Sequence, residues 1–269
     1  MAISMEKIRQ LREKSGAGMA DCRRALEESN GDIDQAVTIL RKSGIAKAAK
    51  RSGRASGEGL IKVAVSADGK EGYILELNSE TDFVARNEKF RNLAERILKL
   101  IMDKKPQSKE ILLGLQLDDI TVRDCVDSLS GVIGEKMALK RYDILHSHNT
   151  VAAYSHPGGQ IGVLVAISKD NARDLAYDMA MQIAAGNPLY IEPKDVPAEM
   201  IAKEKEIFTE QLKTQGKPEK ILTKIIEGKI NKYLEEICLI KQEYIKDDKL
   251  KVEDVLKGVK VKKFIRYSL

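Results

Sequence analysis

The sequence contains no tryptophan and has few other aromatic residues. Its aromatic side chains are eight Tyr and four Phe in a chain of 269 residues. This content is too low for a typical all-β sandwich, or for a protein that binds nucleic acid by stacking bases on aromatic rings. Helices with aliphatic cores are therefore favoured.

Cysteines and long apolar runs are also scarce. Cys22, Cys125 and Cys238 lie too far apart in the sequence for a CxxC metal pair or a disulfide framework, which favours a reducing compartment. No apolar run approaches the roughly 20 residues that span a bilayer. The N-terminus lacks the features of a signal or transit peptide. We therefore expect a soluble cytoplasmic protein that does not bind membranes.

Motifs of common enzyme classes are missing. The patterns GxxxxGK[ST], HExxH and GxSxG do not occur. His146 and His148 alternate with serine at the end of an irregular stretch, which is more typical of solvated loop histidines than of a metal pair without a third ligand. The sequence predicts no catalytic residue, no metal site, no cofactor and no enzymatic activity of its own.

Charge gives a modest basic excess. Forty-six Lys and Arg against 41 Asp and Glu leave a net charge of +5, which would suit an acidic partner without forming a phosphate-binding arm. A short basic stretch contains Lys47, Lys50, Arg51 and Arg54. It is interpreted first as a solvated tether, with contact to an acidic or phosphate surface as the alternative.

The length favours two or more structural units, because single cores stop growing at about 250–300 residues. Residues 1–44 predict three short helices. Ser4 can cap the first, Asp32 with Gln35 resembles a capping box for the third, and Gly44 is a natural stop. The basic stretch then forms a linker over 45–57.

A period-two pattern follows the linker. Apolar residues over 60–65 and 73–77 flank Asp68-Gly69, which predicts a hairpin with a type I′ turn and positive φ at both positions. A helix follows over 90–101. The same order returns with strands over 151–154 and 161–167 and a helix over 175–184, so we expect an α+β fold with an internally duplicated core.

Residues 58–141 form the first predicted core subdomain, which includes a further helix over 120–141. The second combines 142–196 with 241–269, whose last strand, from Val259, is expected to return to the second sheet. Between these two parts, residues 197–240 predict two amphipathic helices joined at Gly216-Lys217-Pro218. Their charged faces indicate a projecting antiparallel coiled-coil hairpin.

Three patches stand apart from this framework. Taken alone, Met19 after the glycines of Gly16-Ala17-Gly18 is a core residue, and His156-Pro157-Gly158-Gly159 is a hairpin turn. In the segment Thr81–Val84, Thr81 or Asp82 is a helix cap and Phe83 is a core residue.

Taken together, the patches resemble the signature segments of the bacterial elongation factor Ts family. The resemblance is carried by residues 15–32 and 78–87, and continues in the family's order over nearly the whole chain. Its further matches are Ile133-Gly134-Glu135, residues 156–165, Gly216-Lys217-Pro218 and Phe264-Ile265-Arg266-Tyr267.

The resemblance implies a guanine-nucleotide exchange factor for elongation factor Tu, with no nucleotide site of its own. The implied fold is a three-helix ubiquitin-associated-like domain, two related α+β subdomains and a coiled-coil hairpin. In the family, the segment that matches Thr81, Asp82, Phe83 and Val84 enters the partner's G domain and disturbs its Mg²⁺ site.

Other family contacts can be carried over in the same way. Met19 and Arg23 match positions that touch the G domain. Ile133 and Gly134 match interface positions in the core, and His156 matches a position that faces the partner's third domain.

The sequence departs from the family at several positions. Ser79 stands where many members have Cys, Ala20 where Met is usual, and Arg23-Arg24 where Lys-Lys is common. We expect these changes to be tolerated. Longer members continue beyond the position of Leu269 into a C-terminal module that touches the G domain, so the resemblance does not extend to this contact.

Two alternatives remain open. One is a nucleic-acid-associated translation protein that uses the basic residues over 47–54 and the basic C-terminal face, although the chain carries no RNA-binding motif and nucleic acid is the less favoured partner. The other is an adaptor that binds through the first 45 residues alone.

Overall fold

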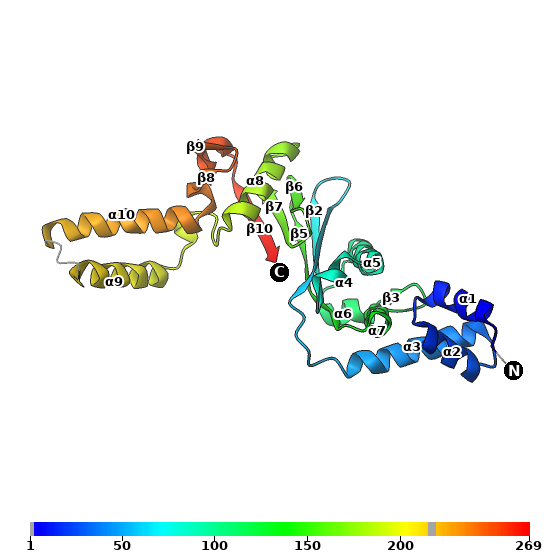
Figure 1. The fold of residues 1–269 in the computed structure, drawn as a ribbon. Coiled ribbons are helices and arrows are strands. Elements are labelled where there is room, and N and C mark those ends of the chain that lie inside the picture. The colour runs from blue at the N-terminus through cyan, green and yellow to red at the C-terminus, as the bar shows by residue number, and fades with distance from the viewer. Residues whose placement is uncertain (1–2, 215–218) are drawn as a thin grey trace.

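Two three-stranded antiparallel sheets stack face to face at the centre of the molecule, with helices on the outer side of each. The computed structural model describes residues 3–214 and 219–269, and it is an α+β protein (Figure 1). Three N-terminal helices lie at one end of the molecule, and a pair of long helices projects at the other. The sheets therefore separate the two helical ends.

The N-terminal helices pack around a small aliphatic core. Ser4 accepts a hydrogen bond from the Lys7 N–H, and Asp32 accepts one from the Gln35 N–H, so both residues cap their helices. The predicted capping box is only half formed, because the Asp32 N–H donates to the Ser29 carbonyl. Met5, the first residue of α1, is 58% exposed. The helices are α1 (Met5–Ser15), α2 (Met19–Glu28) and α3 (Ile33–Ala49).

The prediction that Gly44 ends the third helix is wrong. Helix α3 continues to Ala49, so it includes residues 45–49 of the predicted linker. Gly44 is buried where α3 crosses α7 (Val122–Ile133), and a Cβ on Gly131 would lie 2.2 Å from the Gly44 Cα. The glycine permits a close crossing of two helices instead of a stop.

The first sheet has the strand order β1-β2-β5, and its apolar outer face packs against α5 and α7. The helix predicted over 90–101 is part of α5, and its apolar face is buried. The buried residues of this face are Phe90, Leu93, Ala94, Ile97, Leu98 and Ile101. The elements of this region are β1 (Glu58–Val65), β2 (Glu71–Ser79), α5 (Glu88–Lys104), α6 (Lys109–Gly114), β3 (Gln116–Leu117), β4 (Ile120–Thr121) and β5 (Met137–His146).

The β1–β2 hairpin is present, but its turn is not type I′. Only Gly69 has a positive φ, at 69°, whereas Asp68 does not. The Ser66 carbonyl accepts a hydrogen bond from the Gly69 N–H, and the Ser66 N–H donates to the Glu71 carbonyl. The Asp68 side chain accepts from the Lys70 N–H, so it stabilises the turn through its carboxylate.

The prediction of one helix over 120–141 is also wrong. Helix α7 ends at Ile133, Gly134 adopts a left-handed conformation with φ of 91°, and β5 begins at Met137. Met137 and Leu139 alternate towards the buried face, and β5 pairs with β2 along its whole length. The predicted subdomain boundary at residue 141 therefore falls inside a strand.

The second sheet has the strand order β10-β7-β6, and α8 covers its outer face. The C-terminal strand pairs antiparallel with β7, which confirms the predicted return of the chain to this sheet. Val163 and Val165 pack towards α8, whereas Leu164 and Ala166 pack between the sheets. The elements are β6 (Val151–Ser155), β7 (Ile161–Ile167), α8 (Arg173–Gly186) and β10 (Val261–Ser268).

A polar cluster crosses the space between the sheets. The buried Tyr267 hydroxyl donates a hydrogen bond of 2.7 Å to Asp143, and the Arg141 guanidinium lies 3.9 Å from the centre of the Tyr267 ring. Arg141 also pairs at 2.6 Å with Glu76, a carboxylate that is 4% exposed. The C-terminal strand is thereby tied to the first sheet as well as to the second.

Tyr267→Phe should lower the free energy of unfolding by about 1 kcal/mol, because it removes one hydrogen bond and keeps the ring. Tyr267→Ala should cost about 3–5 kcal/mol, since the buried ring is lost as well. Urea unfolding followed by circular dichroism measures both. Tyr177→Phe is the control, because Tyr177 is 45% exposed and its change should cost under about 0.5 kcal/mol. Equal costs for the two Phe variants would contradict a stabilising role of the Tyr267 hydroxyl.

The projecting helices are α9 (Ala198–Thr214) and α10 (Glu219–Ile237), which lie side by side and antiparallel (Figure 1). The predicted stop at Gly216 and the predicted first helical position at Pro218 fall outside the described residues. A coiled coil in the strict sense stays a prediction. The remaining elements near its base are the 3₁₀ turns η1 (Pro193–Asp195) and η2 (Leu239–Lys241), β8 (Glu243–Tyr244), β9 (Asp247–Lys251) and α11 (Val252–Leu256).

Over residues 3–214 and 219–269, no helix is both long and apolar enough to span a bilayer.

Candidate partner-binding site

The segment Thr81–Val84 presents an exposed aromatic side chain. It follows β2 and comprises the N-cap residue Thr81 and the first three residues of the single helical turn α4 (Asp82–Arg86). Phe83 is 80% exposed, whereas the adjacent Val84 is 5% exposed and packs in the apolar core beside the first sheet. The interpretation of Phe83 as a core residue is therefore wrong. Most of the apolar Phe83 ring is in contact with water, so the ring contributes little to the packing of the fold.

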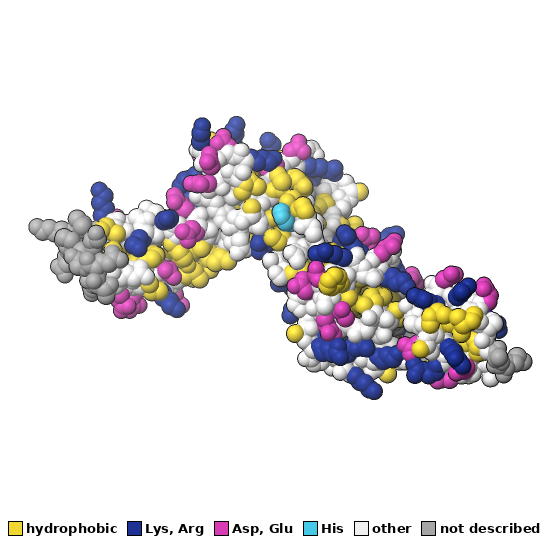
Figure 2. All heavy atoms as spheres, viewed as in Figure 1, with side chains coloured by type: hydrophobic (Ala, Val, Ile, Leu, Met, Phe, Trp, Pro, Cys, Tyr) yellow, Lys and Arg dark blue, Asp and Glu magenta, His cyan; other side chains and the backbone are white. Residues whose placement is uncertain are grey.

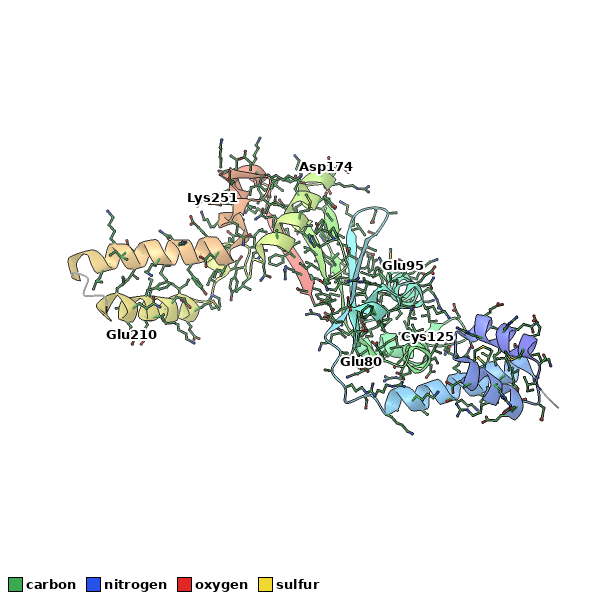
Figure 3. All side chains as sticks on the ribbon, in the orientation of Figure 1. Glu80, Glu95, Cys125, Asp174, Glu210 and Lys251 are labelled. Atoms are coloured by element: carbon green, nitrogen blue, oxygen red, sulfur yellow. The ribbon has the colours of Figure 1, made fainter. Side chains whose placement is uncertain are left out.

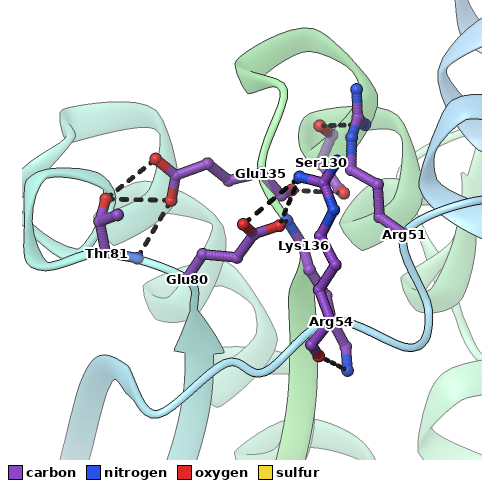
Figure 4. Close-up of polar contacts among 7 residues, drawn as sticks. All are labelled: Arg51, Arg54, Glu80, Thr81, Ser130, Glu135 and Lys136. Atoms are coloured by element: carbon purple, nitrogen blue, oxygen red, sulfur yellow. Dashed lines mark hydrogen bonds and ion pairs between the residues drawn. The ribbon is translucent and has the colours of Figure 1, made fainter.

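Thr81 is held by a carboxylate instead of acting as a helix cap. It occupies the N-cap position of α4 but makes no capping hydrogen bond. Its backbone N–H donates to Glu135 at 3.1 Å, and its hydroxyl donates to the same carboxylate at 2.9 Å (Figure 4). Ser79 pairs with Met137 where β2 meets β5, so the same antiparallel register brings Thr81 opposite Glu135.

Glu80 makes the companion contact. Its carboxylate accepts a hydrogen bond of 2.6 Å from the Lys136 N–H and an ion pair of 3.3 Å from Arg54 (Figure 4). The Lys136 N–H is the largest cause that holds the pKa of Glu80 below its ordinary value of 4.5, and Arg54 acts in the same direction. In Figure 3, Glu80 lies in the central part of the molecule, on the side of the chain that follows α3.

Because the pKa of Glu80 is lowered in the folded chain, its stabilising contribution is present above pH 4.5 and is lost as the pH falls through the folded value. The Lys136 amide resonance should titrate with a midpoint below pH 4.5, as followed by two-dimensional NMR. Glu80→Gln should abolish that transition. A midpoint at or above pH 4.5 would show that the Lys136 N–H does not favour the charged carboxylate.

Asp82 supplies a negative charge next to the exposed ring. Its carboxylate pairs with Arg86 at 3.0 Å, one helical turn later, and both side chains are substantially exposed. A surface pair of this kind is weak, because water screens it. The carboxylate of Asp82 is therefore free to change partners when another surface approaches. The segment combines an apolar ring with an anion on a fixed base.

The other predicted contact residues lie in three places. Gly134, the left-handed residue after α7, directly precedes the carboxylate that holds Thr81, and Ile133 is half-buried beside it. Met19 and Arg23 lie on α2 in the N-terminal bundle, where Met19 is half-buried and Arg23 is exposed and paired with Glu27. His156 lies at the exposed β6–β7 turn, and its ring accepts or donates a hydrogen bond with the Tyr154 hydroxyl at 3.0 Å.

The basic side chains around the linker mostly contact the protein itself. Figure 2 shows Lys and Arg side chains along α3 and the chain that follows it. Lys47 pairs with Asp21 at 2.9 Å, Arg51 donates to the Ser130 carbonyl at 3.4 Å, and Arg54 pairs with Glu80. These contacts disfavour a phosphate-binding surface, and they also differ from the predicted solvated tether, because the side chains pair within the fold.

No group of three His, Cys, Asp or Glu residues suited to a metal ion occurs in the part of the chain that the structure describes. His146 is not a loop residue as expected, since it ends β5 and contacts Glu71 at 3.1 Å. Burial raises the pKa of the Cys238 thiol to about 11, which disfavours the thiolate that a metal or an electrophile requires.

The sequence assigns no role to three residues at the base of Phe83, namely Glu80, Glu135 and Arg54. Glu135 belongs to a block that matches the family, and Arg54 contributes only to the charge of the predicted linker. The missing information is the β2–β5 pairing, because only that register brings residues 80–81 against residues 135–136. A prediction of β5 in place of the end of a helix would have identified the pair.

An exposed aromatic residue on a rigid base, with contact residues in separate parts of the fold, is typical of a protein that acts by docking to another macromolecule. A family model described as "Elongation factor TS" matches residues 80–269. The chain belongs to the elongation factor Ts family, and its members are translation elongation factors.

Several relatives named elongation factor Ts match along almost their full length. The chain is 45% identical to the one from a Nitratiruptor species, over 100% of this chain and 93% of the relative. It is 45% identical to that from Aquifex aeolicus, over 100% and 98%. The relative from Prosthecochloris aestuarii is 42% identical, over 99% and 98%.

Proposed function

We propose that the chain is a guanine-nucleotide exchange factor that binds elongation factor Tu in its GDP-bound and nucleotide-free states. Family membership supports elongation factor Tu as the partner, since the similarity to relatives named elongation factor Ts covers the whole length of this chain. The observation that carries the mechanism is the 80% exposure of Phe83 on a segment whose neighbours are fixed. Burial of such a ring against a partner is favourable, because apolar area is removed from water.

In this mechanism, Phe83 enters an apolar slot between helices of the partner's G domain. The Asp82 carboxylate approaches the Mg²⁺ site at the same time and competes with its water and oxygen ligands. Tight GDP binding depends on Mg²⁺ that bridges phosphate oxygens and on backbone N–H groups around the phosphates. Displacement of either weakens the nucleotide.

Thermodynamic linkage explains how insertion of Phe83 and Asp82 is sufficient to release GDP. A protein that prefers the nucleotide-free partner lowers the partner's affinity for nucleotide by a certain factor. Bound nucleotide lowers the partner's affinity for that protein by the same factor. Each tenfold rise in the release rate needs about 1.4 kcal/mol off the barrier. One buried ring and one carboxylate can supply several such factors, and no covalent step or catalytic base is involved.

The remaining contact residues would extend the interface. Met19 and Arg23 on the N-terminal bundle and Ile133 and Gly134 beside the segment would touch the G domain. His156, on the second sheet, would touch the third domain. Contacts from separate parts of the chain would orient the G domain relative to Phe83.

The test uses elongation factor Tu loaded with a fluorescent GDP. Addition of the chain under excess unlabelled GDP should speed the loss of fluorescence in a saturable manner. An unchanged release rate over a wide range of chain concentration contradicts the proposal. Addition of Mg²⁺ in large excess should slow release, because it opposes loss of the ion.

A further inference from the structure

Two chain segments are joined by reciprocal hydrogen bonds near Phe83. We define them, Glu80–Thr81 and Glu135–Lys136, as the clamp. The Glu135 carboxylate accepts the Thr81 N–H and hydroxyl, while the Glu80 carboxylate accepts the Lys136 N–H. The contacts are reciprocal, because each segment supplies one carboxylate and at least one backbone donor (Figure 4).

The clamp leaves Phe83 little freedom to turn inward. Thr81 is held on one side of the ring, and Val84 is buried on the other. The anchors are three residues apart, and Phe83 lies between them on the outer side of a single helical turn. An isolated turn of five residues is unstable in water, so its geometry must come from these anchors.

Charge-assisted hydrogen bonds suit this task. A carboxylate that accepts N–H and O–H donors makes shorter and stronger bonds than neutral pairs. Thr81 donates to both oxygens of Glu135, at 2.9 and 3.0 Å, so the carboxylate fixes orientation as well as distance. Its far end is fixed too, because the Ser130 hydroxyl donates at 2.6 Å to the Glu135 carbonyl.

The linker is joined to the same point. Arg54 pairs with Glu80 at 3.3 Å, and Lys136 Nζ donates at 2.6 Å to the Arg54 carbonyl. Arg51 donates to the Ser130 carbonyl on α7. The chain that follows the N-terminal bundle is therefore attached to the two segments that support Phe83.

We propose that Glu135 is a positioning residue that holds the segment Thr81–Val84 in its projecting conformation, with Glu80 as its companion. The effect on nucleotide release rests on the proposed function, whereas the effect on the segment itself does not. Pre-organisation of this kind matters for an inserted ring, because a segment ordered before binding loses less conformational entropy on entry.

The first measurement uses the free chain and needs no partner. Amide hydrogen exchange over residues 80–85 should become about tenfold to a hundredfold faster in Glu135→Ala, since hydrogen bonds to a charged group are lost. Helix α5 should keep its protection. Glu95→Ala is the matched control, because it removes an exposed α5 carboxylate paired with Lys62 and leaves the clamp intact (Figure 3).

The second measurement separates positioning from general support. With elongation factor Tu and fluorescent GDP, Glu135→Ala should lower the maximal release rate about tenfold, while the half-saturating concentration changes less than about threefold. Glu135→Gln keeps one acceptor oxygen and should restore part of the rate. Glu95→Ala should match the wild type.

The outcomes are distinct. Wild-type exchange protection over residues 80–85 in Glu135→Ala would overturn the proposal. A faster exchange with an unchanged maximal release rate would overturn the effect on release, because loss of order in the segment would then leave nucleotide release unchanged. If the wild-type chain does not speed GDP release, the proposed exchange function is contradicted. The hydrogen-exchange measurement would still show whether Glu135 holds the segment.

Discussion

Phe83→Ala should lower the maximal rate of GDP release by about 30- to 150-fold. Full burial of an aromatic side chain contributes about 2–3 kcal/mol, and this loss falls on the state in which the ring has entered the partner. The free energy of unfolding should change by less than about 0.5 kcal/mol, because the ring is 80% exposed in the free chain.

Two controls frame this result. Ile111→Ala removes another exposed apolar side chain, at 50% exposure on α6, and should change neither quantity. Phe90→Ala removes a fully buried ring on α5 and should cost about 3–5 kcal/mol of stability. Stopped-flow release and urea unfolding distinguish the three variants.

The division between rate and affinity decides the role of the segment. Phe83→Ala and Asp82→Ala should slow release much more than they weaken the complex, as measured by titration calorimetry with the nucleotide-free partner. Equal losses in rate and affinity would mean that the segment only anchors the chain.

The second large effect is expected at the α3–α7 crossing. Gly131→Ala should destabilise the chain by about 1–3 kcal/mol, because its Cβ would lie 2.2 Å from the Gly44 Cα and 2.5 Å from the Gly44 carbonyl oxygen. Both neighbours are backbone atoms, so the two helices must move apart. The N-terminal bundle, with Met19 and Arg23, would then shift relative to Phe83.

This shift should weaken the complex about tenfold, and the maximal release rate should fall less than in Phe83→Ala, since the Phe83 ring itself is retained. Gly228→Ala is the matched control. Gly228 lies in α10, and a Cβ added there would meet no other atom within 4 Å, so the change should stabilise the helix by about 0.5–1 kcal/mol. Similar stability of the two variants would contradict a tight crossing.

Local patterns in the sequence were sufficient for much of the fold. The capped helices of the N-terminal bundle, the two hairpins and the apolar face of α5 all follow from spacing and turn residues. The errors arose where a distant contact decides the conformation. Gly44 has the composition of a helix stop, but Gly131 on another helix gives it a packing role.

The strand β5 illustrates the same limit. Residues 137–141 continue a helical stretch without a proline, and only their alternate burial against β2 and α7 makes them a strand. The stacking of the two sheets was also not predicted. The apolar stretch of β7 carries a signal for it, because Val163–Ile167 has no polar side to face water.

The candidate site was predicted unequally. The resemblance identified Phe83 and its neighbours, whereas local composition alone favoured burial of the ring. The carboxylates that support the segment could not be identified before β5 was known. The family resemblance thus points to the proposed contact residues, whereas the residues that hold them in place depend on the β2–β5 pairing.

The helical pair α9–α10 leaves and re-enters the core at one point. The Leu189 and Tyr190 N–H groups both donate to the Ile237 carbonyl, at 2.9 and 3.0 Å, and the Leu239 N–H donates back to the Tyr190 carbonyl at 2.9 Å. The two ends of a long excursion are therefore already adjacent, and a short turn could join them without strain in either sheet. We therefore expect that the pair can be replaced, which offers protein engineers a site where another domain could be grafted while the Phe83 end of the molecule is preserved.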